Sequence, residues 1–267
     1  MRSQSTSFWL ASSILLLWCL AALFGRHLDL APNSVNLERI LTPPTLQNCF
    51  AYDDLGRSIF DRLIIGARTS FFVSLWVVSL SAVFGTLVGT IAAWRGGWFD
   101  LAIVRIIDIF LAFPGILLAI ALAGILGPGI NNIIIALTVV GWVGFARLAR
   151  AQTLSIKKRE HIQAAIALGT PTHKTLRRHV IPLIMAPLII EATFGIAGVI
   201  IAEAGLSFLG LGIQPPTASW GTMIKDGTRY MLVAPHMVFA PGLALCLVVL
   251  SVNMLGDKLR DWMDINE

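Results

Sequence analysis

The sequence is poor in charged residues. Only 13% of its 267 residues are Asp, Glu, Lys or Arg, whereas 56% are hydrophobic. Soluble domains contain about twice this share of charged residues. The composition therefore excludes an ordinary soluble protein and predicts an integral membrane protein. The net charge of +5 does not indicate a nucleic-acid partner, because no basic domain lies outside the loops.

Motifs of several catalytic classes are also absent. The chain has no G-x-x-x-x-G-K-[ST] phosphate loop, no G-x-S-x-G and no H-E-x-x-H. We therefore expect neither ATP hydrolysis nor intramembrane proteolysis by this chain. Cysteine is scarce, and the three cysteines and the loop histidines lack metal-ligand spacing, so we predict no metal site; they are Cys19, Cys49, Cys246, His161, His173 and His179.

Long apolar segments are what the sequence has in abundance. A membrane helix needs about 20 mostly apolar residues. The segments are continuous rather than alternating, which predicts helices and not strands. The predicted fold class is therefore an all-α polytopic membrane protein with about six transmembrane helices, at 8–25, 71–94, 106–126, 133–146, 183–202 and 237–255.

Prolines interrupt two of these segments. Pro114 and Gly115 lie inside the third, and Pro187 lies inside the fifth. A proline removes a backbone donor from a helix, so we expect local kinks or unwinding at both places. Gly85 and Gly89 form a small-x-x-x-small pair that favours close approach of another helix.

Positive charge predicts the orientation. Segment 147–182 carries eight Lys and Arg residues against the single acid Glu160, so we place it in the cytoplasm. With six spans, both termini are then cytoplasmic as well. The predicted organisation is an N-terminal anchor helix (1–30), an extracytoplasmic loop (31–65), a membrane domain (66–257) that includes the loop 147–182, and a cytoplasmic tail (258–267).

The cytoplasmic loop has an internal pattern. Residues 158–168 favour a short helix, and Gly169 fits a left-handed cap at its end. Thr170 as N-cap and Pro171 at the first helical position predict a second helix, which runs to about His179 and ends before Pro182. Small side chains at Ala164 and Ala165 permit close approach of another protein. An ordinary basic loop with helix-favouring alanines fits the spacing equally well.

These residues resemble the EAA loop of ABC importer permeases, which is carried here by Gln163-Ala164-Ala165, Gly169 and His179-Val180-Ile181-Pro182. The first glutamate of that motif is replaced by Gln163. Most of the chain is similar to the dipeptide, oligopeptide and nickel permease family, and specifically to its second, C-type subunit. The family often has aspartate where this chain has Ser58. The matching segments are DDLGRSIFDRLIIGARTSF (53–71), LAFPGILLAIALAGILGPG (111–129), EAGLSFLGLGIQPPTASWGTMI (203–224) and NMLGDKLRDWMD (253–264).

The resemblance implies a type I ABC importer permease fold in a bacterial inner membrane. It further implies a second, different permease, two ATPase subunits on the cytoplasmic face, and an extracytoplasmic solute-binding protein. ATP and magnesium would be bound by the partners and no cofactor by this chain. The residues implied to couple the permease to an ATPase are Gln163, Ala164, Ala165, Gly169, His179 and Pro182.

Four residues are candidates for the translocation path or a gate: Pro114, Glu191, Glu203 and Trp220. Carboxylates at membrane depth are costly and are therefore functional candidates. For Glu203 we favour a structural hydrogen bond. The role of Glu191 stays open, and a place near the inner end of the fifth span, facing the partner permease, is one interpretation. Trp220 either contributes to an outer gate or contacts the binding protein, or belongs to a cap that plugs the bundle.

The substrate follows from the resemblance alone. Relatives move dipeptides, longer peptides, nickel or its chelates, opines and antimicrobial peptides, and we favour a peptide. Import of nickel or a metal chelate by the same kind of complex remains an alternative. An ATP-independent channel or membrane scaffold is the alternative from a different class.

Overall fold

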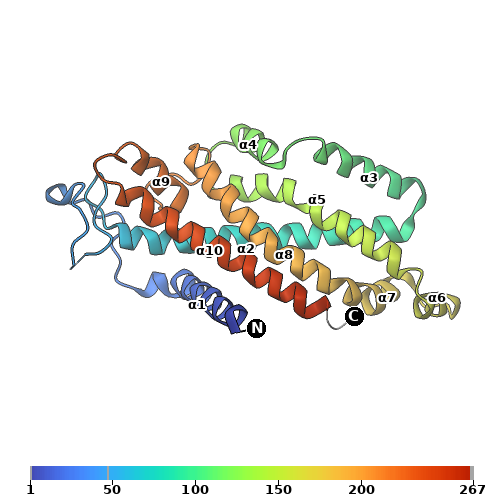
Figure 1. Ribbon diagram of the computed structural model, residues 1–267. Helices are drawn as coiled ribbons and strands as arrows, with labels where there is room; N and C mark the ends of the chain where they lie inside the picture. Colours follow the sequence, from blue (N-terminus) through green and yellow to red (C-terminus); the bar gives the residue numbers. More distant parts are fainter. Residues whose placement is uncertain (1, 47, 265–267) are drawn as a thin grey trace.

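The computed structural model describes residues 2–46 and 48–264. Most of it is helical, and the described residues form no strand beyond two isolated β-bridges. The long helices lie side by side in an elongated bundle (Figure 1). The α-helices are α1 (Arg2–Phe24), α2 (Ile59–Arg95), α3 (Gly97–Leu111), α4 (Gly115–Leu126), α5 (Ile130–Ile156), α6 (Glu160–Ala167), α7 (Thr172–Thr175), α8 (Ile181–Phe208), α9 (Trp220–Thr228) and α10 (His236–Asp264).

Three shorter turns complete the described elements: the 3-10 helices η1 (Gly25–His27) and η2 (Leu37–Arg39), and the π-helical turn η3 (Leu176–Val180). Five of the six predicted spans are confirmed as single helical segments among the described residues. These segments are long and apolar enough to cross a membrane, and they are Ser7–His27, Ile59–Arg95, Ile130–Ile156, Thr172–Phe208 and His236–Met263.

The third predicted span, 106–126, is not a single helix. It is divided between α3 and α4, whose axes differ by 86°. Pro114 is the N-cap of α4 and has an extended ψ of 122°. A proline cannot donate the hydrogen bond that would continue α3, so the chain turns here and starts a new helix. By contrast, α8 runs unbroken through Pro187.

Several predicted boundaries fall inside helices. The predicted cytoplasmic loop begins at 147, but α5 continues to Ile156. Helix α2 begins at Ile59, ahead of the predicted boundary at 66. The predicted tail 258–267 is helical as part of α10 up to Asp264, and residues 265–267 lie outside the described residues. The membrane helices therefore continue through segments that contain charged residues, where the prediction ended them.

Helices α2 and α5 form the central pair of the bundle. Gly85 and Gly89 of α2 face the backbone of Trp142 and Ala146 on α5, and a Cβ at either glycine would collide with that backbone. Glycine at these two positions therefore allows the helix axes to approach closely.

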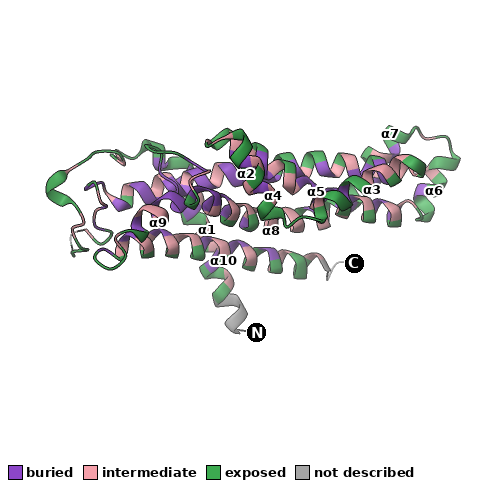
Figure 2. Cartoon of the chain, turned by 90° about the horizontal axis from the view of Figure 1, so that it is seen from above, coloured by how far each residue is buried: buried purple, intermediate pink, exposed green. Residues whose placement is uncertain are grey.

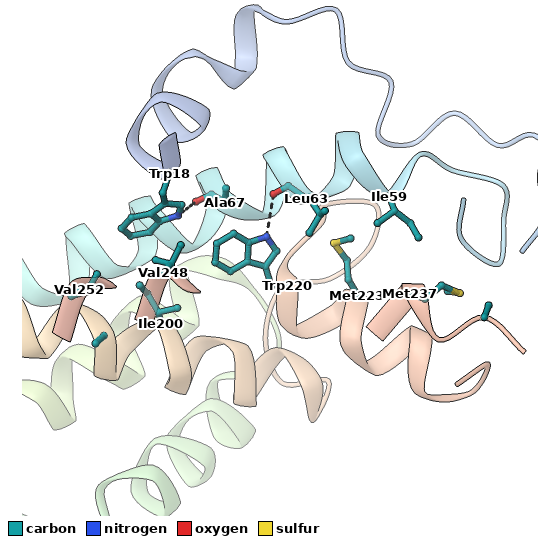
Figure 3. Close-up of a cluster of buried hydrophobic side chains, with 12 residues drawn as sticks. Trp18, Ile59, Leu63, Ala67, Ile200, Trp220, Met223, Met237, Val248 and Val252 are labelled. Atoms are coloured by element: carbon teal, nitrogen blue, oxygen red, sulfur yellow. Dashed lines mark hydrogen bonds between the residues drawn. The ribbon is translucent and has the colours of Figure 1, made fainter. Parts of the chain in front are cut away.

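One end of the bundle is closed by α9. Trp18 of α1 and Trp220 of α9 point toward α2 and donate hydrogen bonds to the carbonyl oxygens of Ala67 (3.2 Å) and Leu63 (3.1 Å) (Figure 3). The rings lie in a buried cluster that also receives residues of α8 and α10. Burying aromatic rings with their N–H groups satisfied holds these helices together.

The predicted extracytoplasmic loop is fixed at its junction with α2. Asp53 accepts from the Arg57 guanidinium at 2.6 Å and from the backbone N–H groups of Leu55 and Arg57. Ser58 is the N-cap of α2 and accepts from the N–H of Asp61. Serine and aspartate are both preferred N-caps, which explains how serine serves at this position. Burial, and then the neighbouring Asp53 carboxylate, raise the pKa of Asp54.

Candidate functional site

The helix ends next to the EAA-like loop form a rigid base for it. Arg150 of α5 makes two short hydrogen bonds to Asp100 of α3, at 2.6 and 2.7 Å. Just after α5, the Lys157 ammonium donates to the carbonyl oxygen of Trp94 at 2.7 Å and lies over the Trp94 ring. These contacts tie α5 to α2 and α3, so the start of the loop cannot move independently of the bundle.

The short helix α6 is anchored by two side chains. Ile162 is fully buried in a cluster with Val180 and Ile184 from the other side of the loop. The Gln163 amide donates to the carbonyl oxygen of Lys157 at 2.7 Å. A glutamate carboxylate could not donate this bond. Gln163 therefore fixes the start of α6 through a contact that the usual glutamate would not make.

Gly169 ends α6 as predicted. Its φ is +77°, its N–H donates to Ile166, and the N–H of Thr170 donates to Ala165. This pair of hydrogen bonds is the Schellman motif, which requires the left-handed conformation that glycine adopts without strain. A Cβ at Gly169 would meet no atom within 4 Å, so backbone conformation rather than crowding selects glycine here.

The second half of the loop differs from the prediction. Pro171, not Thr170, is the N-cap, and the helix does not end before Pro182. It continues from Thr172 through η3 into α8, and the N–H of Ile181 donates to Leu176, five residues back. His179 is half-buried in η3, and Pro182 is exposed in the first turn of α8. These two residues belong to a membrane helix and not to the exposed tip.

The tip of the loop exposes small and apolar side chains. Ala164 and Ala167 are exposed, Ala165 is half-buried, and Leu168 is 85% exposed. Figure 2 shows α6 mostly in green at the end of the bundle. A large apolar side chain beside alanines that permit close approach has the character of a protein-docking surface.

A cavity of approximately 550 Å³ lies between α2, α4, α5 and α8. Volumes of this order accommodate small ligands. Its walls are apolar except for two side chains, Ser81 of α2 and Glu191 of α8. Gly115, directly after the break at Pro114, lies in the wall, so the turn between α3 and α4 helps to form the cavity.

Glu191 lies near the middle of the helical segment Thr172–Phe208. Its place near the inner end of the span, facing a partner permease, stays a prediction. The side chain is half-buried, and none of the described residues forms an ion pair or hydrogen bond with it. A carboxylate at this depth is expected to meet a polar partner or ligand, because burial without one is costly.

Glu203 has a different environment near the end of α8. It is fully buried and accepts hydrogen bonds from Ser70 of α2 at 2.9 Å and from Ser207 at 2.8 Å. Trp220, at 2% exposure, is also packed inside the bundle, where it lies against Gly66. Both residues hold α9 and α8 against α2, and a path or gate role for either stays a prediction.

Two features of the site escaped the sequence analysis. The hydroxyl of Ser81 is buried and has no hydrogen-bond partner among the described residues. Gly141 and Gly144 of α5 leave the space into which Ser81 and Glu191 project. The sequence did carry a signal: Ser74 and Ser81 are seven residues apart and thus share one face of the helix.

Comparisons with known proteins agree with the geometry. The family described as "Binding-protein-dependent transport system inner membrane component" matches residues 85–265. The dipeptide transport system permease protein DppC of Alkalihalophilus pseudofirmus is 44% identical over 224 residues, which are 84% of this chain and 74% of that protein. The glutathione transport system permease protein GsiD of Escherichia coli is 41% identical over 256 residues, covering 95% of this chain and 84% of that protein.

A solved structure shows the same fold. The chain is similar to the inward-facing methionine ABC transporter MetNI, with a TM-score of 0.61 and 19% sequence identity. The match covers 76% of this chain and 97% of the other. At this identity the likeness establishes the type I ABC importer permease fold.

Proposed function

We propose, since the chain belongs to the family of binding-protein-dependent transport system inner membrane components, that it forms half of the path of an ATP-driven peptide importer. The relatives named for dipeptide and glutathione transport support a small peptide as the substrate. The approximately 550 Å³ cavity is large enough for such a molecule. Transport would proceed by alternating access, in which rigid-body movement opens the path to one side at a time.

Permeases of this family work in a membrane complex with an ATPase and a solute-binding protein. We infer that the complex has two ATPase subunits, one of which docks at the tip formed by α6 and Gly169, and that a second, different permease completes the path. ATP and magnesium would be bound by the ATPases. The observation that carries this proposal is the exposed apolar tip, with Leu168 85% exposed on a helix that Ile162 fixes to the membrane bundle.

Substitution at Gly169 tests the coupling. Gly169→Val introduces a β-branched residue at a φ of +77°, which strains or rearranges the turn. We expect ATP-dependent dipeptide uptake to fall at least tenfold while the protein remains in the membrane. The matched control is Gly169→Asn, because asparagine tolerates this conformation, and it should retain most of the uptake.

The same experiment includes the outcome that contradicts the proposal. If Gly169→Val supports normal uptake and retains the ATPases on purification, the tip does not couple ATP use to transport. Uptake that persists without ATP would favour the channel alternative. Assays with dialanine, glutathione and Ni²⁺ distinguish peptide import from metal import.

A further inference from the structure

We infer that Ser81 and Glu191 form a site for a cationic hydrogen-bond donor, such as the protonated amino group of a peptide, within the cavity between α2, α5 and α8. The inference rests on the proposed function for its substrate class. It adds the polar contact that the substrate makes inside the membrane.

The first argument is position. A Cβ at Gly141 would lie 2.8 Å from the Ser81 hydroxyl oxygen, and one at Gly144 would lie 3.0 Å from Glu191 Oε1. These glycines are three residues apart, so they are neighbours on one face of α5. The hydroxyl and the carboxyl group therefore approach neighbouring positions of α5, and both residues line the same cavity.

The second argument is hydrogen-bonding capacity. The Ser81 hydroxyl is buried and unpaired among the described residues, and those residues offer Glu191 no ion pair. Two acceptors of this kind match an ammonium group, which carries up to three donors and a positive charge. A carboxylate or phosphate ligand would instead be repelled by Glu191.

The third argument is the surrounding surface. Every other residue lining the cavity is apolar or glycine, so no other side chain in the lining offers a hydrogen bond or a charge to the ligand. Charge interactions are stronger in such an environment than in water. An unpartnered carboxylate here is therefore expected to attract cations into the cavity.

Cysteine labelling tests the inference directly. Gly198 lines the cavity two helical turns from Glu191, about 10 Å along α8. A Cβ at Gly198 meets no atom within 4 Å, so a cysteine fits there. In the assembled complex, with Cys19, Cys49 and Cys246 replaced by serine, Gly198→Cys is treated with a cationic and an anionic methanethiosulfonate. We expect the cationic reagent to react about tenfold faster when Glu191 is present than in Glu191→Gln.

A matched control uses Gly124→Cys on α4, which is exposed, has no neighbour at its Cβ and does not line the cavity. Its charge preference should not depend on Glu191. Equal preference at Gly198→Cys with and without Glu191 would overturn the inference, and would fit a carboxylate neutralised by a proton or by a cation of the partner permease. Failure of both reagents to label, with the unfolded protein labelled normally, would overturn it too.

Failure of this inference and failure of the proposed function give different results. Labelling does not require transport, so charge preference at Gly198→Cys can be present even if no peptide is imported. Conversely, normal peptide uptake without charge preference would retain the importer and reject the cation site.

Discussion

Glu191 and Glu203 lie on the same helix, α8, in contrasting surroundings. Glu203 is fully buried and both carboxyl oxygens accept hydrogen bonds from serines. Glu191 is half-buried beside a cavity and has no such partner among the described residues. The glycines nearby follow the same division: Gly221 packs against the backbone of Ala204, whereas Gly198 faces open space.

The contrast separates two reasons for keeping a carboxyl group at membrane depth. A buried group with its hydrogen bonds satisfied fixes the packing of its helices. A carboxyl group that is unpaired and faces a cavity contributes little to folding, and its desolvation cost must be offset by something outside this chain. Glu203 is therefore structural, whereas Glu191 is available for a ligand or a partner.

The largest expected effect is on stability at Glu203. Glu203→Ala leaves Ser70 unpaired and opens a void in a fully buried site, which should lower the free energy of unfolding by roughly 3 kcal/mol. Glu191→Ala removes no hydrogen bond and should change it by less than about 0.5 kcal/mol. Thermal unfolding of the two variants in the same detergent compares them. Equal losses would remove the distinction between the two glutamates.

The two glycines provide an intermediate test. Gly221→Ala places a methyl group against the Ala204 carbonyl and should destabilise the protein by about 1–3 kcal/mol. Gly198→Ala lies in a helix with free space and should be neutral or stabilising by up to about 1 kcal/mol. The readout is the shift in melting temperature of each variant from that of the unchanged protein. A destabilising Gly198→Ala would show that the cavity is closed in the membrane.

Glu191→Gln tests the comparison through transport instead of stability. Loss of the charge should reduce peptide uptake about tenfold, or about 1.4 kcal/mol, with unchanged membrane abundance. Peptide uptake by Glu191→Asp should lie between that of Glu191→Gln and that of the unchanged protein. Asp108→Asn removes an exposed carboxylate of α3 outside the cavity and should keep uptake within about twofold. Equal losses in the two neutral variants would assign the effect to overall charge.

Local features of the fold were predictable from the sequence. The mean hydropathy of a segment depends only on residues that are close together in the sequence. It therefore identified five single-helix spans. The break at Pro114 and the turn at Gly169 also follow from the conformations of single residues. A structural hydrogen bond at Glu203 was predicted, but its donor Ser70 is 133 residues away in the sequence and could not be identified.

Features that depend on distant contacts were not predictable. The positive charge of segment 147–182 suggested that a loop begins at 147, yet Arg150 pairs with Asp100 of α3 and the helix continues to Ile156. The 86° angle between α3 and α4 depends on how α4 packs against α5 and α8. The cavity needs Ser81, Glu191 and the glycines of α5 together, and no single segment of the sequence contains them.

Uptake by the purified complex tests the account most directly. The tagged chain is extracted gently with its partners, reconstituted in proteoliposomes, and supplied with ATP and the binding protein loaded with radiolabelled dialanine. We predict that a second permease and ATPases co-purify, and that dialanine accumulates only when ATP is hydrolysed. Recovery of the chain alone, or dialanine movement that does not depend on ATP, would contradict an ATP-driven peptide importer.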